Sequence, residues 1–362
     1  MGTPDLYVSG VGVCLPETVT VEHAVSAGWY PAEQAELHQL GGAAVAGDVP
    51  APELALRAAR SALARSGRSP ADLDLLLYAS TWQQGPEGWP PHAYLQRHLA
   101  GDRVLAIQLR QGCNGMFAAL ELATGYLRAG PRGRAALLVA ADNYGTPLAD
   151  RWRMGPSYVA GDAGSAVVLD TEPGFARLRS VCSASVSAAE EMHRAAEPLF
   201  PPGITQGRAL DFAAHTERYR QRAIGDGSGT GVLVTVHQRL AEVIDQSLAE
   251  AGITLDDVTR VAVMNHSQSI TEQMCEAALG LPLSRSAWEF GRNVGHCGAS
   301  DQILALEHLV AAGELGPGDH LLMLGQGPGV VLSGAVMEIL DSPAWARQPA
   351  AGNGARGNGA RA

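Results

Sequence analysis

The sequence predicts an α/β protein built from two related halves. Three observations support this fold class: apolar runs of strand length alternate with amphipathic helical stretches, part of the pattern recurs later in the chain, and the composition suits a large core. Hydrophobic residues make up 46% and charged residues 17% of the 362 positions, which is typical of a globular protein rather than a disordered chain.

The first half contains the elements of a buried sheet. Strands are expected at Leu6–Val13, Leu73–Ser80, Ala135–Ala141 and Ser165–Asp170. Leu73–Ser80 is a continuous apolar run, which is typical of a strand buried on both faces. Apolar residues at helical spacing predict a helix over Pro52–Ser66, which ends near a glycine.

The second half repeats the first. Leu73 and Val258 begin matching apolar strands after matching helix ends and turns (258 − 73 = 185). The tripeptide that starts at Ala119 recurs at Ala305 (305 − 119 = 186), again followed by a helix, a Gly-Pro turn and an apolar strand. Two matches at nearly one offset predict an N-terminal half, 1–175, and a C-terminal half, 176–342, related by a pseudo-twofold axis.

Two segments lie outside this pattern. Residues 183–231 are irregular and rich in proline and glycine, which favours a lid or tunnel wall. Residues 343–362 are rich in Ala, Gly, Asn and Arg and are expected to be a disordered tail.

Charge and composition exclude several functions. The net charge is −11, so we expect no nucleic-acid partner. All 26 basic residues are arginine, which excludes Schiff-base chemistry and a P-loop lysine. No apolar stretch is long enough to cross a membrane, and the N-terminus lacks the pattern of a secretory signal. Five widely spaced cysteines then predict reduced thiols and a cytoplasmic location.

Cys113 is the candidate nucleophile. It stands between glycines in Gln111-Gly112-Cys113-Asn114-Gly115, after an expected strand, Val104–Leu109, and before a helix that starts near Met116. A tight turn into a helix N-terminus would expose the sulfur and favour the thiolate. The alternative is a small buried core cysteine, but a core position does not need glycines on both sides.

His266 is the candidate base. It follows the buried strand Val258–Val263, so its imidazole is placed at the carboxyl end of a strand. The alternative is a hydrogen-bonded structural histidine. By the repeat offset, Cys113 matches Ala299, so the loop Gly291–Asp301 is expected to converge on the cysteine loop.

That second loop supplies further candidates. Asp301 could orient His266, or it could cap the helix Gln302–Val310. His296 is a further catalytic candidate and Cys297 a candidate substrate contact, and the alternative for both is simple packing in the wall of the site. They predict no metal site because no second cluster of ligands exists.

Gly329 is the candidate oxyanion donor. It ends Gly325-Gln326-Gly327-Pro328-Gly329, which follows the expected strand Leu321–Leu324. Pro328 has no N–H, so the Gly329 amide is the natural donor. A strand, Val330–Met337, comes next instead of a helix, so this is not a dinucleotide fingerprint. The alternative is a plain glycine-rich turn.

Together these segments resemble the thiolase superfamily, and within it the β-ketoacyl-carrier-protein synthase III group. The resemblance covers nearly the whole chain and rests on Gly12–Glu17, Gln111–Cys113, Gly161–Ala166, Asn265–Gln268 and Gly325–Gly329. It implies a thiolase-like fold in αβαβα layers and a homodimer. It also implies that coenzyme A or phosphopantetheine thioesters are substrates, with no cofactor and no metal.

The chain departs from that group at the third catalytic position. The condensing enzymes carry a Cys-His-Asn triad; without a gap their asparagine falls on His296, and Asn293 fits only if the loop has changed length. Asp301 resembles the aspartate of a divergent branch, the acyltransferases of antibiotic pathways. A carboxylate would oppose the enolate of decarboxylative condensation but would raise the basicity of a histidine. The departure favours acyl transfer to an oxygen, or to another thiol.

The resemblance also implies substrate contacts. Trp29 is similar to a tryptophan near the mouth of the pantetheine tunnel. Arg151, Trp152 and Arg153 lie where the family contacts the phosphoadenosine end or docks a carrier protein, and Trp89 lies where it inserts an aromatic side chain into the partner's acyl pocket. The alternatives are solvated surface for the arginines and core packing for Trp89.

We therefore expect a homodimeric acyltransferase of secondary metabolism with ping-pong kinetics. Cys113 would take an acyl or aryl-acyl group from an acyl carrier protein or coenzyme A, with the amides of Cys113 and Gly329 holding the oxyanion. His266, oriented by Asp301, would deprotonate the hydroxyl of a small-molecule acceptor such as a sugar or alcohol.

Three alternatives stay open. One is a decarboxylative synthase that condenses the acyl group with malonyl-carrier protein, with Asn293 as the third residue. Another is acyl transfer between two carrier proteins. The last is a non-catalytic partner subunit, although such a subunit would be expected to have lost Cys113. The sequence predicts neither the acyl group nor the acceptor.

Overall fold

Eleven strands and ten α-helices make up the described part of the chain, which covers residues 6–129, 134–145, 148–225, 227 and 229–347 of the computed structural model. The strands are β1 (Tyr7–Cys14), β2 (Thr18–Thr20), β3 (Gly42–Ala44), β4 (Leu73–Ala79), β5 (Leu105–Leu109), β6 (Ala135–Asp142), β7 (Ala163–Asp170), β8 (Ala176–Ser185), β9 (Val258–Ala262), β10 (His320–Gly327) and β11 (Val331–Ile339). The helices are α1 (Val21–Ser26), α2 (Ala32–His38), α3 (Ala51–Ser66), α4 (Pro91–Leu95), α5 (Gly115–Arg128), α6 (Phe212–Gly225), α7 (Gly229–Ala251), α8 (Gln268–Glu272), α9 (Trp288–Val294) and α10 (Asp301–Ala311).

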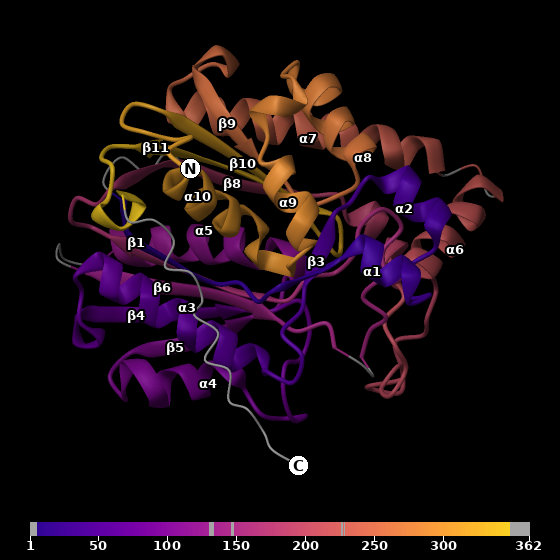
Figure 1. Ribbon diagram of the computed structural model, residues 1–362, viewed down its shortest axis with the longest axis horizontal. Coiled ribbons are helices and arrows are strands. Elements are labelled where there is room, and N and C mark those ends of the chain that lie inside the picture. Colours follow the sequence, from indigo (N-terminus) through magenta and orange to yellow (C-terminus); the bar gives the residue numbers. More distant parts are fainter. Residues whose placement is uncertain (1–5, 130–133, 146–147, 226, 228, 348–362) are drawn as a thin grey trace.

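The strands form two sheet halves around a central pair of helices. The strand order is β5-β4-β6-β7-β1-β8-β11-β10-β9, and β1 meets β8 over only two residue pairs. Helices α5 and α10 contact strands of both halves, as Figure 1 shows near the middle of the molecule. Helix α3 covers β1, β6 and β7, and α7 covers β8 and β11. The result is the αβαβα layering that the family resemblance implies.

The internal repeat is visible at the turns that precede the central helices and the inner strands. The 3₁₀ turns Gly112–Asn114 and Gly298–Ser300 lead into α5 and α10 at matching places (298 − 112 = 186). The 3₁₀ turns Pro70–Asp72 and Leu255–Asp257 lead into β4 and β9, and each carries a capping box. The two loops that the sequence analysis expected to converge therefore sit at equivalent ends of one layer.

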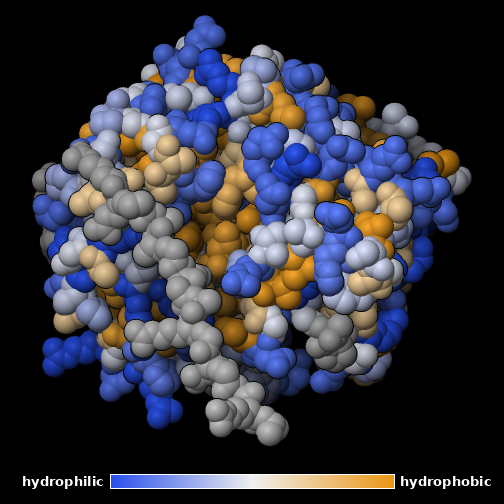
Figure 2. Space-filling view, in the orientation of Figure 1, coloured by the Kyte–Doolittle hydropathy of each residue, from blue (hydrophilic) through white to orange (hydrophobic). Residues whose placement is uncertain are grey.

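The core explains why those loops are held rigidly. The inner helices bury long apolar side chains, including Phe117 and Leu120 of α5 and Ile303 and Leu306 of α10, between the sheet halves. Each fully buried side chain of this kind stabilises the fold by roughly 1.5–3 kcal/mol. Figure 2 shows polar residues over most of one face, with apolar residues gathered toward its centre.

Two expectations about irregular segments need correction. The segment 183–231 is irregular only in part, because it contains α6 and the first residues of α7, and its role as a lid or tunnel wall stays a prediction. Residues Ala344–Arg347 of the expected tail form a 3₁₀ turn, and Trp345 packs edge-on against Phe175 and under the Arg65 guanidinium. Residues 348–362 lie outside the described residues. Among the helices that the structure describes, none combines the length and the apolar character needed to cross a membrane.

Candidate active site

Cys113 lies in the middle of the 3₁₀ turn Gly112–Asn114, which we call the nucleophile turn, at the N-terminus of α5. Gly112 has φ +54°, a conformation that favours glycine. A Cβ at Gly112 would lie 2.3 Å from Cδ of Pro328, so the turn is also packed tightly against the β10–β11 connection. Cys113 itself is half-buried. Both the backbone conformation and the packing therefore require a glycine at position 112.

A linear chain of three side chains runs through the site. Sγ of Cys113 is 3.0 Å from Nε2 of His296, and Nδ1 of His296 is 2.6 Å from Oδ2 of Asp301. His296 and Asp301 are both fully buried. The backbone of His296 is held by hydrogen bonds to Val159 and Gly161, which fixes the direction of its ring.

The carboxylate of Asp301 is held by four donors. Oδ2 accepts from the Asn265 amide at 2.8 Å as well as from His296, and Oδ1 accepts from the Cys297 amide at 2.7 Å and from Nδ2 of Asn265 at 3.3 Å. Donors on both oxygens suit an ionised carboxylate, because the anion accepts at every lone pair. Asp301 therefore acts as a fixed negative charge behind His296.

The charge state of His296 follows from its two neighbours. Burial by itself would lower the pKa of His296, but the Asp301 carboxylate and the Cys113 sulfur outweigh that effect and hold the pKa well above its ordinary value. A protonated imidazole beside sulfur stabilises the thiolate. The site can therefore present a Cys113 thiolate and a His296 imidazolium as an ion pair.

His266 does not contact Asp301, which corrects the expected pairing. Its Nδ1 is 3.1 Å from Oγ of Ser157, while the carboxylate of Asp301 is occupied by His296 and Asn265. Burial lowers the pKa of His266 to about 4, and the nearby charge of His296 contributes to that lowering. His266 is therefore neutral near pH 7. It is joined to His296 through Tyr158, whose ring packs edge-on against both imidazoles, with centroids 5.5 and 4.9 Å away.

Two other residues of the second loop lie away from the reacting groups. Asn293 is exposed at the end of α9, and its Nδ2 donates to the carbonyl of Glu289, so it does not take the third position. Cys297 is fully buried in an apolar cluster with Ala163 and Leu304, where burial raises its thiol pKa well above the ordinary value. Neither side chain lines the site, because the loop turns sharply at Gly295 and Gly298.

Gly329, the expected oxyanion donor, lies in the connection between β10 and β11. Gly329 and Val330 have positive φ values, +80° and +51°, and Val330 is held by a hydrogen bond from the Val186 amide to its carbonyl. This connection packs on the nucleophile turn through Pro328. The oxyanion role of the Cys113 and Gly329 amides remains a prediction.

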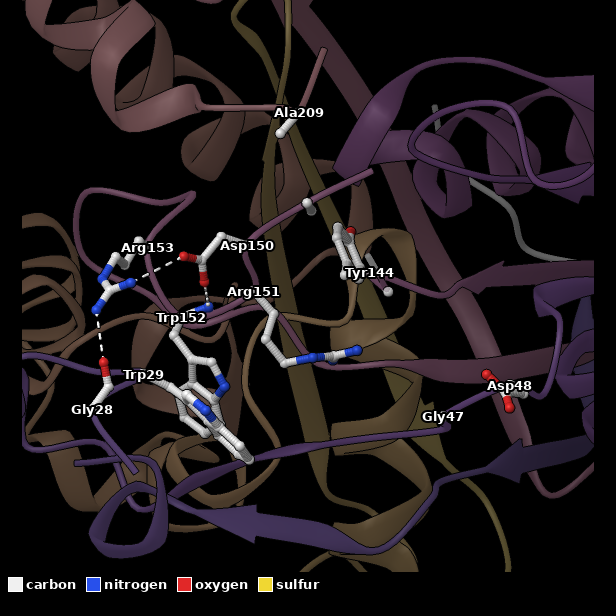
Figure 3. Close-up of a pocket in the computed structure, with 12 residues that line it drawn as sticks. Gly28, Trp29, Gly47, Asp48, Tyr144, Asp150, Arg151, Trp152, Arg153 and Ala209 are labelled. Carbon is white, nitrogen blue, oxygen red and sulfur yellow. Dashed lines mark hydrogen bonds and ion pairs between the residues drawn. The ribbon is translucent and has the colours of Figure 1, made fainter. Parts of the chain in front are cut away.

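A pocket of about 610 Å³, which we call the entrance pocket, contains most of the expected substrate-binding residues (Figure 3). Trp29 is half-exposed, and Arg153 at the rim bonds to Asp150 and to the carbonyl of Gly28. Tyr144 also lines this pocket, and its hydroxyl contacts Thr81 beside the turn that precedes Asp301. The lining residues are Gly28, Trp29, Gly47, Asp48, Tyr144, Gly145, Ala149, Asp150, Arg151, Trp152, Arg153 and Ala209.

Three of the expected substrate-contact residues have neighbours within the chain. Arg151 makes a two-pronged ion pair with the fully buried Asp162, so its charge is already neutralised. Trp152 is buried against Tyr30, although it also lines the pocket. Trp89 is half-buried and packs edge-on against Tyr94; its contact with a partner subunit stays a prediction.

Sequence reasoning missed three residues that shape the site. Asn265 holds Asp301, and its position beside His266 was the one available signal. Ser157 and Tyr158 reach the site from the segment between β6 and β7, and no motif marks them. Among the described residues, no group of three or more His, Cys, Asp or Glu side chains is arranged to hold a metal ion.

Comparison with known proteins gives two family matches. Residues 107–185 match the model of 3-oxoacyl-[acyl-carrier-protein] synthase III, and residues 248–339 match the model of its C-terminal part. The first match contains Cys113, and the second contains His266, His296 and Asp301. Both loops of the site therefore fall within the matched segments.

Individual relatives cover almost the whole chain. A solved structure named ChlB3 and described as an acyltransferase is 59% identical, with a TM-score of 0.89, and covers 94% of this chain and 100% of that chain. The acetoacetyl-CoA synthase NphT7 of Streptomyces sp. (strain CL190) is 28% identical over 81% of this chain and 85% of its own length. The synthase III structure of Pseudomonas aeruginosa PAO1 is 22% identical with a TM-score of 0.72, over 93% of this chain and 99% of that chain, which shows the shared fold.

Proposed function

Because the chain belongs to the 3-oxoacyl-[acyl-carrier-protein] synthase III-like branch of the thiolase superfamily, we propose that it transfers an acyl group from a thioester to a hydroxyl group through an acyl-enzyme on Cys113. One observation carries this proposal: the Cys113–His296–Asp301 chain couples the nucleophile to a histidine backed by a carboxylate. This is the arrangement of a nucleophile, a base and an orienting anion that acyl transfer to oxygen needs.

In the loading step, the Cys113 thiolate attacks the carbonyl carbon of the donor thioester. The amides of Cys113 and Gly329 hold the tetrahedral oxyanion. The carbon–sulfur bond of the donor then breaks, and the departing thiolate takes the proton from the His296 imidazolium. Loading therefore leaves an acyl group on Cys113 and a neutral His296.

In the transfer step, neutral His296 takes the proton of the acceptor hydroxyl while the oxygen attacks the acyl carbon. The bond to Cys113 breaks, which restores the thiolate and the imidazolium. Asp301 stabilises the imidazolium that forms and keeps the ring in the tautomer that can accept a proton at Nε2. The base in this proposal is His296 and not His266, because His266 has no carboxylate partner and a pKa of about 4.

The entrance pocket supports delivery of the donor by a phosphopantetheine arm of a carrier protein or coenzyme A. Half-exposed Trp29 and the edge of Trp152 offer apolar surface for the arm, and Arg153 at the rim is half-exposed. A guanidinium there suits a phosphate group. Arg151 supports the wall through Asp162 instead of meeting the donor.

The charges of the site favour acyl transfer over condensation. Condensation with malonyl-carrier protein forms an enolate, which neutral hydrogen-bond donors stabilise. Here the position expected to hold the family's asparagine is occupied by His296, with the Asp301 carboxylate 2.6 Å behind it. That negative charge would oppose an enolate and would help a histidine to deprotonate a hydroxyl.

The experiment separates loading from transfer. The enzyme is mixed with butyryl-CoA, the adduct is measured by intact mass, and the acyl-enzyme is then offered methyl β-D-glucopyranoside, N-acetylcysteamine or malonyl-carrier protein. We expect one butyryl group per chain, ester formation with the glycoside, and no carbon dioxide from malonyl-carrier protein at turnover rates. We expect the Cys113→Ala variant to form no adduct.

The matched control is Cys14→Ala, because Cys14 is also half-buried but lies in β1. This variant should load like the parent enzyme. Carbon dioxide and a ketoacyl product would identify a condensing enzyme and refute the proposal. Transfer to N-acetylcysteamine alone would identify transfer between thiols, as between two carrier proteins.

A further inference from the structure

A second hydrogen-bonded pair, Ser157 and His266, lies beside the catalytic chain. Oγ of Ser157 is 3.1 Å from Nδ1 of His266, and the Ser157 carbonyl accepts a hydrogen bond from the Ser267 amide at 2.7 Å. The carbonyl of His266 accepts from Nε1 of Trp288 at 3.3 Å. The loop that carries His266 is therefore held from two sides, and Ser157 orients its ring.

The two histidines of the site differ in charge because their partners differ. His296 is bonded to a carboxylate, whereas His266 is bonded to a hydroxyl, which adds no charge. Burial and the neighbouring imidazolium keep His266 neutral near pH 7. A neutral imidazole has one N–H donor and one acceptor nitrogen. If the Ser157 hydroxyl donates to Nδ1, the ring proton is on Nε2.

The position of His266 suits contact with substrate. Tyr158 packs edge-on against both imidazoles, so His266 is one aromatic ring away from the base that takes the acceptor proton. With Nδ1 bound to Ser157, Nε2 is the nitrogen left for a ligand. His266 also lines a cavity of about 100 Å³ together with Met264 and Gly325, and this cavity does not include Cys113 or His296. An N–H aimed at an oxygen that becomes negative stabilises it most when its direction is preset.

We propose that Ser157 is a positioning residue that holds His266 as the Nε2–H tautomer, so that His266 donates a hydrogen bond to the acceptor oxygen while His296 removes its proton. This inference rests on the proposed acyl transfer to a hydroxyl. In this inference His296 transfers the proton, and neutral His266 stabilises the oxygen by a hydrogen bond. The acceptor is a hydroxyl compound able to bridge the two imidazoles.

Three variants and a control test the proposal in the full-length enzyme. Ser157→Ala removes the hydroxyl, Ser157→Thr keeps it, and His266→Gln removes the imidazole. The control Ser180→Ala deletes another buried hydroxyl, which lies in β8 and donates to the Ser247 carbonyl. The probes are butyryl-CoA for loading and methyl β-D-glucopyranoside for transfer. We expect Ser157→Ala to slow transfer roughly fivefold, as for one neutral hydrogen bond, and to change loading less than about twofold.

A double-mutant cycle distinguishes positioning from general support. If Ser157 acts through His266, the Ser157→Ala change should have no further effect on transfer in the His266→Gln enzyme. We expect Ser157→Thr to transfer at the parent rate and Ser180→Ala to leave transfer unchanged. Equal slowing by Ser157→Ala in both backgrounds would overturn the inference, as would equal slowing of loading and transfer.

The tautomer provides a readout that needs no acceptor. In the ¹⁵N spectrum of histidine-labelled enzyme, we expect His266 as the Nε2–H form in the parent and as a mixture of tautomers in Ser157→Ala. An Nδ1–H form in the parent would refute the inference even if acyl transfer occurs. If the parent loads butyryl but esterifies no hydroxyl, the proposed function fails while the tautomer result stands by itself.

Discussion

The proton on His296 depends on one carboxylate. Burial alone would lower the pKa of this histidine, and Asp301 together with the Cys113 sulfur reverses that effect. Nδ1 of His296 and Oδ2 of Asp301 are 2.6 Å apart, and three other donors hold the carboxylate in place. The reactivity of Cys113 therefore depends on Asp301, which acts on the sulfur through His296.

An Asp301→Asn change tests this dependence. The amide carries no charge, so the pKa of His296 falls and the imidazolium is lost at neutral pH. The Cys113 thiolate then loses its counter-ion, and we expect alkylation by iodoacetamide at pH 7 to slow about tenfold, with a rate that rises as pH rises. Site-resolved mass spectrometry measures the rate. Cys14 is the internal control, and unchanged alkylation of Cys113 would refute the role of Asp301.

The sequence analysis placed the correct loops close together, but it paired Asp301 with His266, whereas Asp301 is bonded to His296. Cys113, His266 and Asp301 follow strands or begin helices at one end of the layers, which periodicity and the repeat offset reveal. The direction of each ring depends instead on backbone turns such as Gly295, with φ +77°, and on hydroxyls from distant segments such as Ser157. Such contacts have no sequence periodicity, so the sequence placed His296 among the catalytic candidates without predicting its hydrogen bond to Asp301.

At the scale of elements, the nucleophile turn depends on close packing with the β10–β11 connection. A Cβ on Gly112 would meet the Pro328 ring, and the backbone has φ +54°. Movement of Pro328 would displace the neighbouring Gly329 amide. The geometry of the proposed oxyanion site is therefore set by the contact between a turn of the first half and a hairpin of the second.

A Gly112→Ala change should disturb both stability and loading. Gly67→Ala is a matched control, because Gly67 has φ +71° at the end of α3 but no atom lies within 4 Å of the place that an added methyl group would take. Both changes should cost about 1 kcal/mol from backbone strain, measured by urea unfolding. We expect only Gly112→Ala to slow butyryl loading, by about tenfold or more. Equal loading by both variants would show that the packing against Pro328 does not matter.

Elements with a strong hydrophobic periodicity could be predicted from the sequence, and elements with a weak hydrophobic periodicity could not. Helix α3 was expected over Pro52–Ser66 and spans Ala51–Ser66, because its buried face repeats at helical spacing. Helix α6 was missed, since among its residues only Ala223 is buried and its pattern is mostly polar. The turn around Trp345 was missed because it is held by contacts of one side chain with Phe175 and Arg65, which leave no periodic pattern in the sequence.

For the whole molecule, the exposed edge of the sheet favours the homodimer that the family resemblance implies. Strand β5 ends the sheet, and its Leu105 and Ile107 are 49% and 40% exposed. An edge strand with exposed apolar side chains is an open template for pairing with another chain. A second copy that pairs its own β5 here would cover both residues by a twofold axis. Strand β5 leads directly into Gln111 and the nucleophile turn, so pairing would also steady the active site.

An Ile107→Arg change should therefore separate the subunits. A charge on the outward face of β5 opposes its own copy across the twofold axis and leaves an arginine to be desolvated. We expect sedimentation velocity to show a dimer for the parent enzyme and a monomer for the variant, with slower butyryl loading. Leu37→Arg is the matched control, because Leu37 is 68% exposed on α2, away from β5. A dimer that survives Ile107→Arg but dissociates with Leu37→Arg would move the interface to the α2 face and remove the link between β5 pairing and Cys113.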